Sequence, residues 1–109
     1  MPWATFCVPE ADDSEWIRSL SISCHNISLL MDSMGRLDDA LESAHQGVLL
    51  RERLVKQDPD NTDYLRNLGD AYERRGSLLQ SRGDMDAAMT DYGRGLEVSE
   101  RLAALDPAH

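Results

Sequence analysis

One segment of this sequence occurs twice. Residues 35–59 resemble residues 83–107 at a constant offset of 48 positions. The identical residues in the first segment are Gly35, Asp38, Ala40, Gly47, Glu52, Arg53, Leu54, Asp58 and Pro59. Their counterparts in the second segment are Gly83, Asp86, Ala88, Gly95, Glu100, Arg101, Leu102, Asp106 and Pro107. A fixed offset of roughly 20–50 residues is the signature of stacked structural repeats. Because repeat arrays present extended surfaces, the pattern favours a chain that holds a partner over one that transforms a substrate.

The match extends upstream of this segment. At the same offset, Asp12 corresponds to Asp60, Arg18 to Arg66, and Leu20 to Leu68. The sequence therefore predicts a non-repeated N-terminal segment at 1–11, a first repeat at 12–59 and a second repeat at 60–109.

Each repeat divides into two helices with apolar residues at helical spacing. In the first helices the predicted core stripe is Ile17, Leu20, Cys24, Ile27 and Met31, answered in the second repeat by Leu65, Leu68, Tyr72 and Leu79. In the second helices it is Leu37, Leu41, Ala44, Val48 and Leu54, and then Met85, Met89, Tyr92, Leu96 and Leu102. Small residues also recur seven apart, at Ser21 and Ser28 and at Gly69 and Gly76, where two helices can approach closely.

The ends of these helices are marked by glycine and proline. Gly35 and Gly83 can supply the left-handed residue that follows a helix, and Asp58-Pro59 and Asp106-Pro107 close each repeat because proline cannot continue a helix. No stretch alternates apolar and polar residues as a strand does. The predicted fold is therefore all-α, with four long helices in two stacked antiparallel hairpins.

This pattern resembles the tetratricopeptide repeat family. The second repeat shows Leu68-Gly69-x-x-Tyr72, Gly83, Ala88, Tyr92, Gly95 and Pro107, and the first shows Leu20-Ser21-x-x-Cys24, Gly35, Ala40, Ala44, Gly47 and Pro59. The family repeat has about 34 residues, so this one is longer by about seven residues per helix. Seven residues are almost two helical turns, which lengthens a helix while nearly keeping its inward face. The chain looks like an elongated variant of the kind found in bacterial multi-repeat scaffold proteins, stacked as a short superhelical array.

The composition excludes several classes of partner. The net charge of −9 disfavours nucleic acid and anionic membranes, since both are bound largely through basic residues. No apolar run reaches the length of a membrane span, and the start, MPWATFCVPE, does not look like a secretion signal. We therefore expect a cytoplasmic protein.

Catalytic and metal chemistry are not predicted. Cys24 and His25 are neighbours, so on a helix they point about 100° apart, and no His-x3-His or Cys-x2-Cys spacing occurs. Acidic pairs such as Asp38 and Asp39 lie at helix starts, where the helix dipole favours negative charge. We expect no enzyme activity, no metal and no cofactor.

The resemblance implies that a protein or peptide partner of unknown identity binds the concave face, which the first helix of each pair lines. Ile22 and Leu29 lie roughly opposite the predicted core stripe, and they form the apolar part of this face. The complete predicted site is Arg18, Ile22, His25, Asn26, Leu29, Arg66, Asp70, Glu73, Arg74 and Ser77. The family's chaperone-binding clamp is disfavoured, because the chain has a single lysine, Lys56, on a second helix.

Two alternatives leave no open groove. Residues 1–11, with Trp3, Phe6 and Val8, could fold back over Ile22 and Leu29, or a homodimer could cover them. A structural role is the runner-up function, either as a self-associating helical module or as a fragment of a longer array. Terminal repeats normally carry polar outer faces, whereas the last helix here keeps the self-association candidates Val98, Leu102 and Leu105.

Overall fold

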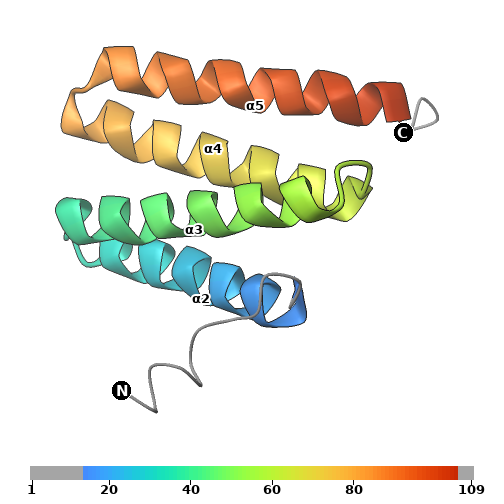
Figure 1. Cartoon of the computed structure of the whole chain (residues 1–109). Coiled ribbons are helices and arrows are strands. Elements are labelled where there is room, and N and C mark those ends of the chain that lie inside the picture. Colours follow the sequence, from blue (N-terminus) through green and yellow to red (C-terminus); the bar gives the residue numbers. More distant parts are fainter. Residues whose placement is uncertain (1–13, 106–109) are drawn as a thin grey trace.

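The computed structural model describes residues 14–105, and within them it contains four α-helices and no strand. The helices are α2 (Ser14–Ser33), α3 (Leu37–Gln57), α4 (Thr62–Arg82) and α5 (Met85–Leu105). They follow one another as two antiparallel hairpins in a single stack, with α2 and α5 at its two ends (Figure 1). The predicted all-α fold is therefore confirmed. The segment 1–11 and the closing Asp106-Pro107 lie outside the described residues.

The two hairpin turns are built in the same way. Gly35 and Gly83 have φ angles of 75° and 92°, in the left-handed region that a residue with a Cβ rarely adopts. The amide of Asp84 donates to the carbonyl of Leu79 at 2.9 Å, and that of Arg36 to the carbonyl of Met31 at 2.9 Å. These bonds satisfy carbonyls that the end of a helix would leave unpaired. The prediction that these glycines end the first helix of each pair is confirmed.

The two hairpins are joined by a short link. Helix α3 ends before Asp58, whose amide still bonds to the carbonyl of Leu54, and Pro59 follows. Helix α4 then begins after Asn61, whose side-chain oxygen accepts a hydrogen bond from the amide of Tyr64 at 3.1 Å. An asparagine in this position pairs one of the free amides at the start of a helix.

Small residues allow the two helices of each hairpin to approach closely. Ser28 is fully buried, and its hydroxyl donates to the carbonyl of Ala40 across the first hairpin at 3.1 Å. The equivalent Gly76 is covered by the ring of Tyr92, and a Cβ built there would lie 2.9 Å from Tyr92 Cε1. The predicted role of the small residues seven apart is thus confirmed.

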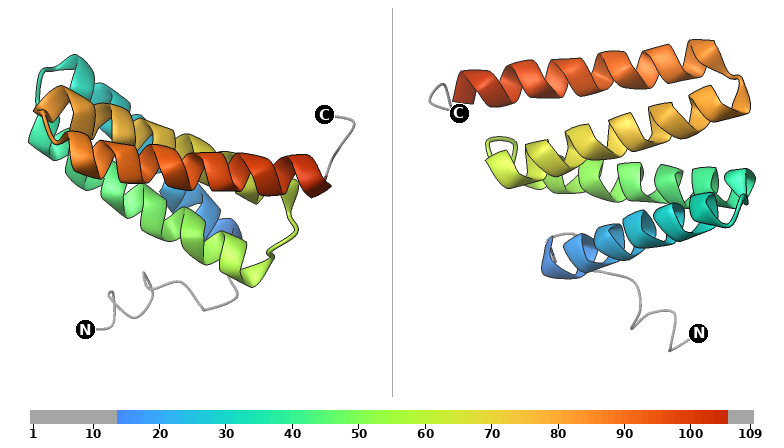
Figure 2. Two further views of the ribbon diagram at one scale, coloured as in Figure 1. Left: turned by 90° about the horizontal axis from the view of Figure 1, so that it is seen from above. Right: turned by 180° about the vertical axis from the view of Figure 1, so that it is seen from behind.

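A separate core joins the hairpins between α3 and α4. Val48 packs with Leu68, Ala71 and Tyr72 in one cluster, with Val55 and Val98 against its edge. Ala40 and Ala44 pack with Leu78 in a second cluster, with Met31, Leu37 and Leu41 beside it. Figure 2 shows that each helix of the stack lies beside its neighbour in the sequence. Helices α3 and α4 therefore pack along a helix on each of two sides, whereas α2 and α5 each pack closely along one.

The predicted core stripes are wrong at four positions. Ile27, Met85, Met89 and Leu96 were expected inside the core, but all four are exposed large apolar side chains. The reason is their place in the stack, because these residues lie on the sides of α2 and α5 that no other helix covers. Small and polar residues are buried in their place, including Ser21 and Ser28 on α2 and Asp91 and Gly95 on α5.

Candidate functional site

A groove runs between the first helices of the two hairpins, α2 and α4, with α3 at its base. One end is an open hollow of about 500 Å³ lined by Arg18 of α2 and by Asn61, Asp63, Tyr64 and Asn67 of the α4 start. Further along, a narrow pocket of about 10 Å³ is lined by His25, Ser28, Ala44, Gly47, Arg51, Ala71 and Arg74. The pocket is no larger than one water molecule, so a ligand would lie along the groove and not inside the protein.

Arg51 forms the base of the groove. It projects from α3, is only 7% exposed, and donates through Nη1 to the carbonyl of Asn67 on α4 at 3.0 Å. Its Nε atom is buried and has no hydrogen-bond partner among the described residues. Burial lowers the pKa of Arg51, and the carboxylate of Asp70 partly opposes that change. Arginine stays charged in proteins, so a positive charge lies at the base of the groove.

Arg74 spans the groove from α4 to α2. Its Nη2 atom donates to Asp32 Oδ2 at 3.1 Å and to the carbonyl of Ser28 at 3.5 Å. Its Nε atom is also buried without a partner in the described part of the chain. Two guanidinium groups therefore each hold one unpaired N–H donor beside the same pocket.

Charges of both signs act on the groove. The pKa of His25 is lowered, first because burial disfavours the imidazolium and then because Arg51 and Arg74 repel it. Asp70 acts in the opposite direction. Burial raises the pKa of the Cys24 thiol, and Arg51 partly opposes this. Both side chains are therefore expected to be uncharged at neutral pH.

The structure brings together only part of the predicted site. Arg18, His25 and Arg74 line the two hollows. Ile22 and Leu29 follow Arg18 and His25 by one helical turn and are exposed, so they lie at the rim on the α2 side. Asp70 is exposed, and it is close enough to act on the charges of Arg51 and His25. The remaining predicted residues, Asn26, Arg66, Glu73 and Ser77, are exposed and do not line these hollows.

Sequence reasoning missed the base of the groove. Arg51, Asn61, Asp63, Tyr64 and Asn67 were not singled out, yet they make up much of its lining. Arg51 could have been noticed in the sequence, because it is the charged member of a row of otherwise apolar residues on one side of α3 that ends at Val55. The asparagines gave none, because their part in the groove depends on how the hairpins pack.

The residues predicted for self-association occupy the C-terminal half of α5. Val98 is half-buried and packs against the core between the hairpins. Leu102 is also half-buried, and Leu105 is exposed. Val98 further lines an open hollow of about 390 Å³, together with Val55, Leu65, Leu68, Tyr72, Arg94, Glu97 and Arg101.

Two searches of residues 14–105 were negative. No cluster of three or more histidine, cysteine or acidic side chains is arranged to hold a metal ion. None of the described helices combines the length and the apolar character that crossing a membrane requires.

Comparison with known protein families supports the repeat assignment. Residues 21–61 match the family model described as tetratricopeptide repeat, from the middle of the first helix to the residue that precedes α4. The chain contains a tetratricopeptide repeat. Members of this family generally act by binding protein partners and are typically not enzymes. No curated protein and no solved structure matches the chain.

The match covers most of the first hairpin. The second hairpin is related to it by the internal offset of 48 residues and by the same turn geometry at Gly35 and Gly83.

Proposed function

We propose that this chain is a protein-interaction module that binds an extended peptide in the groove between α2 and α4. The observation that carries the proposal is the set of three arginines that line the two adjoining hollows, Arg18 in the open hollow and Arg51 and Arg74 in the narrow pocket. The buried Nε atoms of Arg51 and Arg74 adjoin a space the size of one water molecule, so a peptide would meet the outer parts of these side chains and not those atoms.

The charge of the groove selects an acidic group on that peptide. Arginine forms strong, paired hydrogen bonds with carboxylates. Arg18, Arg51 and Arg74 supply positive charge here, beside Asp63 in the open hollow and Asp32 paired with Arg74, whereas the chain as a whole carries −9. A glutamate or aspartate of the peptide would therefore be drawn to the groove and repelled by most of the remaining surface.

The rim adds an apolar contact. Ile22 and Leu29 expose 44% and 43% of their surface, one turn beyond Arg18 and His25. A large apolar side chain of the peptide, placed beside its carboxylate, would cover them. Each fully buried side chain of this size contributes about 1.5–3 kcal/mol.

The test is binding to an array of short immobilised peptides of varied sequence. Peptides bound by the natural protein should share an acidic residue next to a large apolar one. Arg74→Gln should weaken binding by about tenfold or more, because a hydrogen bond to a charged group contributes roughly 1.5–3 kcal/mol. Ile22→Asp should also weaken it, since its carboxylate would oppose an acidic peptide.

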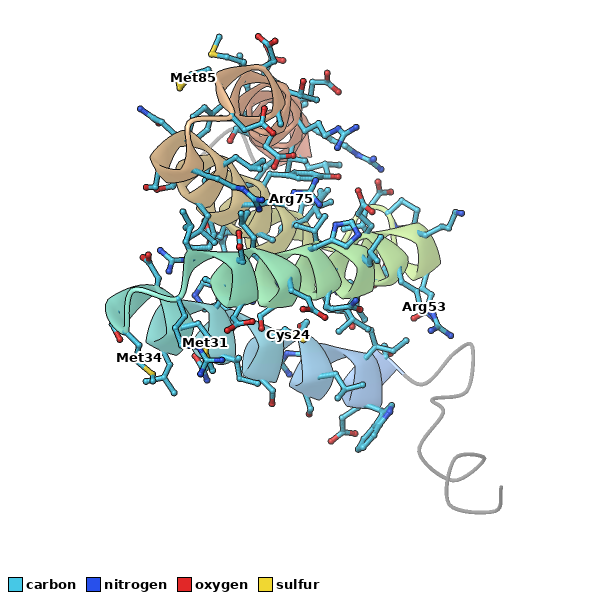
Figure 3. The ribbon with its side chains drawn as sticks, turned by 90° about the vertical axis from the view of Figure 1, so that its left-hand side faces the viewer. Cys24, Met31, Met34, Arg53, Arg75 and Met85 are labelled. Carbon is cyan, nitrogen blue, oxygen red and sulfur yellow. The ribbon has the colours of Figure 1, made fainter. Side chains whose placement is uncertain are left out.

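Arg53→Gln is the matched control. Arg53 is exposed on α3 and points away from α4, so its removal changes the net charge equally without touching the groove (Figure 3). Equal losses in Arg74→Gln and Arg53→Gln would show a nonspecific charge effect and contradict the proposal. Circular dichroism must show unchanged helicity in each variant.

A further inference from the structure

The outer sides of α2 and α5 each carry an uninterrupted row of uncharged residues. On α5 the row is Met85, Met89, Tyr92, Leu96, Ser99 and Ala103, spaced alternately by four and three residues. Five of these are exposed, and Tyr92 is half-buried because its ring covers Gly76 of α4. On α2 and the residue after it, the row is Leu20, Ser23, Ile27, Leu30 and Met34, with the same kind of spacing. We call these rows the α5 seam and the α2 seam. The spacing is that of residues that face a neighbouring helix.

The repeat shows what each seam corresponds to. Shifted back by 48 positions, the α5 seam becomes Leu37, Leu41, Ala44, Val48, Arg51 and Val55 of α3. Shifted forward by 48, the α2 seam becomes Leu68, Ala71, Arg75, Leu78 and Arg82 of α4. These two sets meet each other in the junction between the hairpins, where Val48 packs on Leu68 and Ala71, and Ala44 on Leu78.

Exposure marks the difference between the junction and the seams. Val48 is 1% exposed and Leu78 is 2% exposed, whereas their equivalents Leu96 and Leu30 are 62% and 55% exposed. The α3 half of the interface between the hairpins is thus repeated on α5, and the α4 half is repeated on α2. At both places most of the repeated residues are exposed. Figure 3 shows Met34 and Met85, one from each seam, at opposite outer ends of the molecule.

The seams are also more apolar than the junction they repeat. The junction contains Arg51, Arg75 and Arg82, which bond to Asn67, Asp91 and Asp38 respectively. At the equivalent seam positions the chain has Ser99, Ile27 and Met34. Contiguous uncharged rows with several exposed large apolar side chains, in a chain with 28% charged residues, indicate surfaces that become covered.

We propose that the α5 seam of one copy of this chain docks against the α2 seam of a second copy, head to tail. The docked pair repeats the α3–α4 junction, with Leu96 in the place of Val48 and Leu30 of the next copy in the place of Leu78. A second copy is the occupant because the chain carries both complementary halves of a junction that it already forms internally. Two different surfaces meet, so each added copy leaves a new free seam, and the assembly grows unless it closes into a ring.

Docking would also create a second groove. Arg66 and Glu73 of α4 occupy the positions that Arg18 and His25 occupy on α2. With a second copy in place, they would face its α2 helix, where Asn26 takes the position of Arg74. Asn26, Arg66 and Glu73, which do not line the groove within one copy, would therefore line the groove between two copies. This part of the proposal does not depend on which peptide binds.

The experiment uses one charged substitution in each seam, Leu30→Asp and Leu96→Asp, in the full chain. Both side chains are exposed in a single copy, so neither substitution should unfold it. The natural protein should show a molecular mass that rises with concentration in sedimentation or light scattering. Each variant alone should associate at least about 100-fold more weakly, because the substitution buries an unpaired charge.

Mixing the two variants gives the decisive result. Leu30→Asp keeps an intact α5 seam and Leu96→Asp keeps an intact α2 seam, so an equimolar mixture should form a dimer with one copy of each. The control is Leu49→Asp, on α3, because Leu49 is 47% exposed and its equivalent in the second repeat is already Glu97. That variant should associate like the natural protein.

Several outcomes would overturn head-to-tail docking. A symmetric dimer through α5 alone would be abolished by Leu96→Asp and unaffected by Leu30→Asp. Coverage of the α2 seam by residues 1–13 of the same chain would leave the natural protein monomeric at every concentration. Failure of the mixed variants to form a dimer, with helicity intact in both, would also refute the proposal.

Discussion

Arg75 holds Asp91 in a two-pronged ion pair, with Nε 2.7 Å and Nη2 2.8 Å from the two carboxylate oxygens. The side chains are 13% and 3% exposed, so the pair is largely removed from water. The Nη1 atom of Arg75 also lies 3.0 Å from Nδ1 of His45 on α3. Arg75 therefore connects α4 to both of its neighbours, and its bond to Asp91 raises the pKa of the guanidinium.

Asp91→Ala should destabilise the fold strongly. Removing one member of a buried pair leaves the other charge uncompensated, at a cost of about 3–5 kcal/mol. The residual exposure of Arg75 places the expected loss at the lower end of that range. Urea unfolding followed by circular dichroism measures it.

Asp60→Ala is the control for that prediction. Asp60 also pairs with an arginine, Arg101, but at 3.7 Å and with an aspartate side chain that is 80% exposed. Exposed pairs contribute at most about 1 kcal/mol, so the change should be small. Similar losses in the two variants would show that the position of Asp91 has no special role.

Two glycine substitutions should change stability in opposite directions. Gly76→Ala would place a Cβ 2.9 to 3.3 Å from three ring atoms of Tyr92, and relieving such crowding costs about 1–3 kcal/mol. Gly93→Ala, on α5, would place its Cβ in open space and gain about 0.5–1 kcal/mol of helix stability. Thermal unfolding in dilute solution should give a lower melting temperature for Gly76→Ala and a higher one for Gly93→Ala. A higher melting temperature in both would mean that the Tyr92 ring moves aside at no cost.

The helices and their turns could be predicted because their signals are local. Glycine at a left-handed position and proline after a helix act within a few residues, so the turn at Gly35 and the end of α3 shortly before Pro59 followed from the sequence. The repeat then predicted the second hairpin from the first.

The outer seams could not be predicted in the same way. An apolar stripe indicates that a helix packs against something, but it does not say whether the neighbour belongs to the same chain. Ile27 and Leu96 therefore looked like core residues, although no described helix covers them. The burial of Asp91 could not be predicted for the opposite reason, since this carboxylate is buried only because Arg75 lies opposite it.

His25 should make the fold less stable as the pH falls. Its pKa in the folded chain is below 6.5, so the unfolded chain binds the proton more readily. The free energy of unfolding should therefore be constant well above pH 6.5 and decrease as the pH falls from there toward the lower pKa of folded His25. His25→Gln should remove this part of the pH dependence.

Nuclear magnetic resonance tests the cause of that shift. In Arg74→Gln the pKa of His25 should rise, because one repelling charge is gone, but it should stay below 6.5 because burial is the largest cause. A value in the natural protein at or above 6.5 would contradict the combined effect of burial and of the two arginines on His25.

Salt should act in opposite directions on the two proposed interactions. Each copy carries −9, so two copies repel one another, and the seams that meet contain no charged residue whose attraction salt could screen. Raising the ionic strength from about 0.01 to 1 M shortens the screening length from about 30 to 3 Å, so self-association should strengthen. Binding of an acidic peptide beside Arg51 and Arg74 should weaken over the same range, because its attraction to the guanidinium groups is screened. Sedimentation of the natural protein and peptide binding by the monomeric Leu96→Asp variant measure the two effects separately. Self-association that weakens with salt would mean that charged residues outside the seams form the contact.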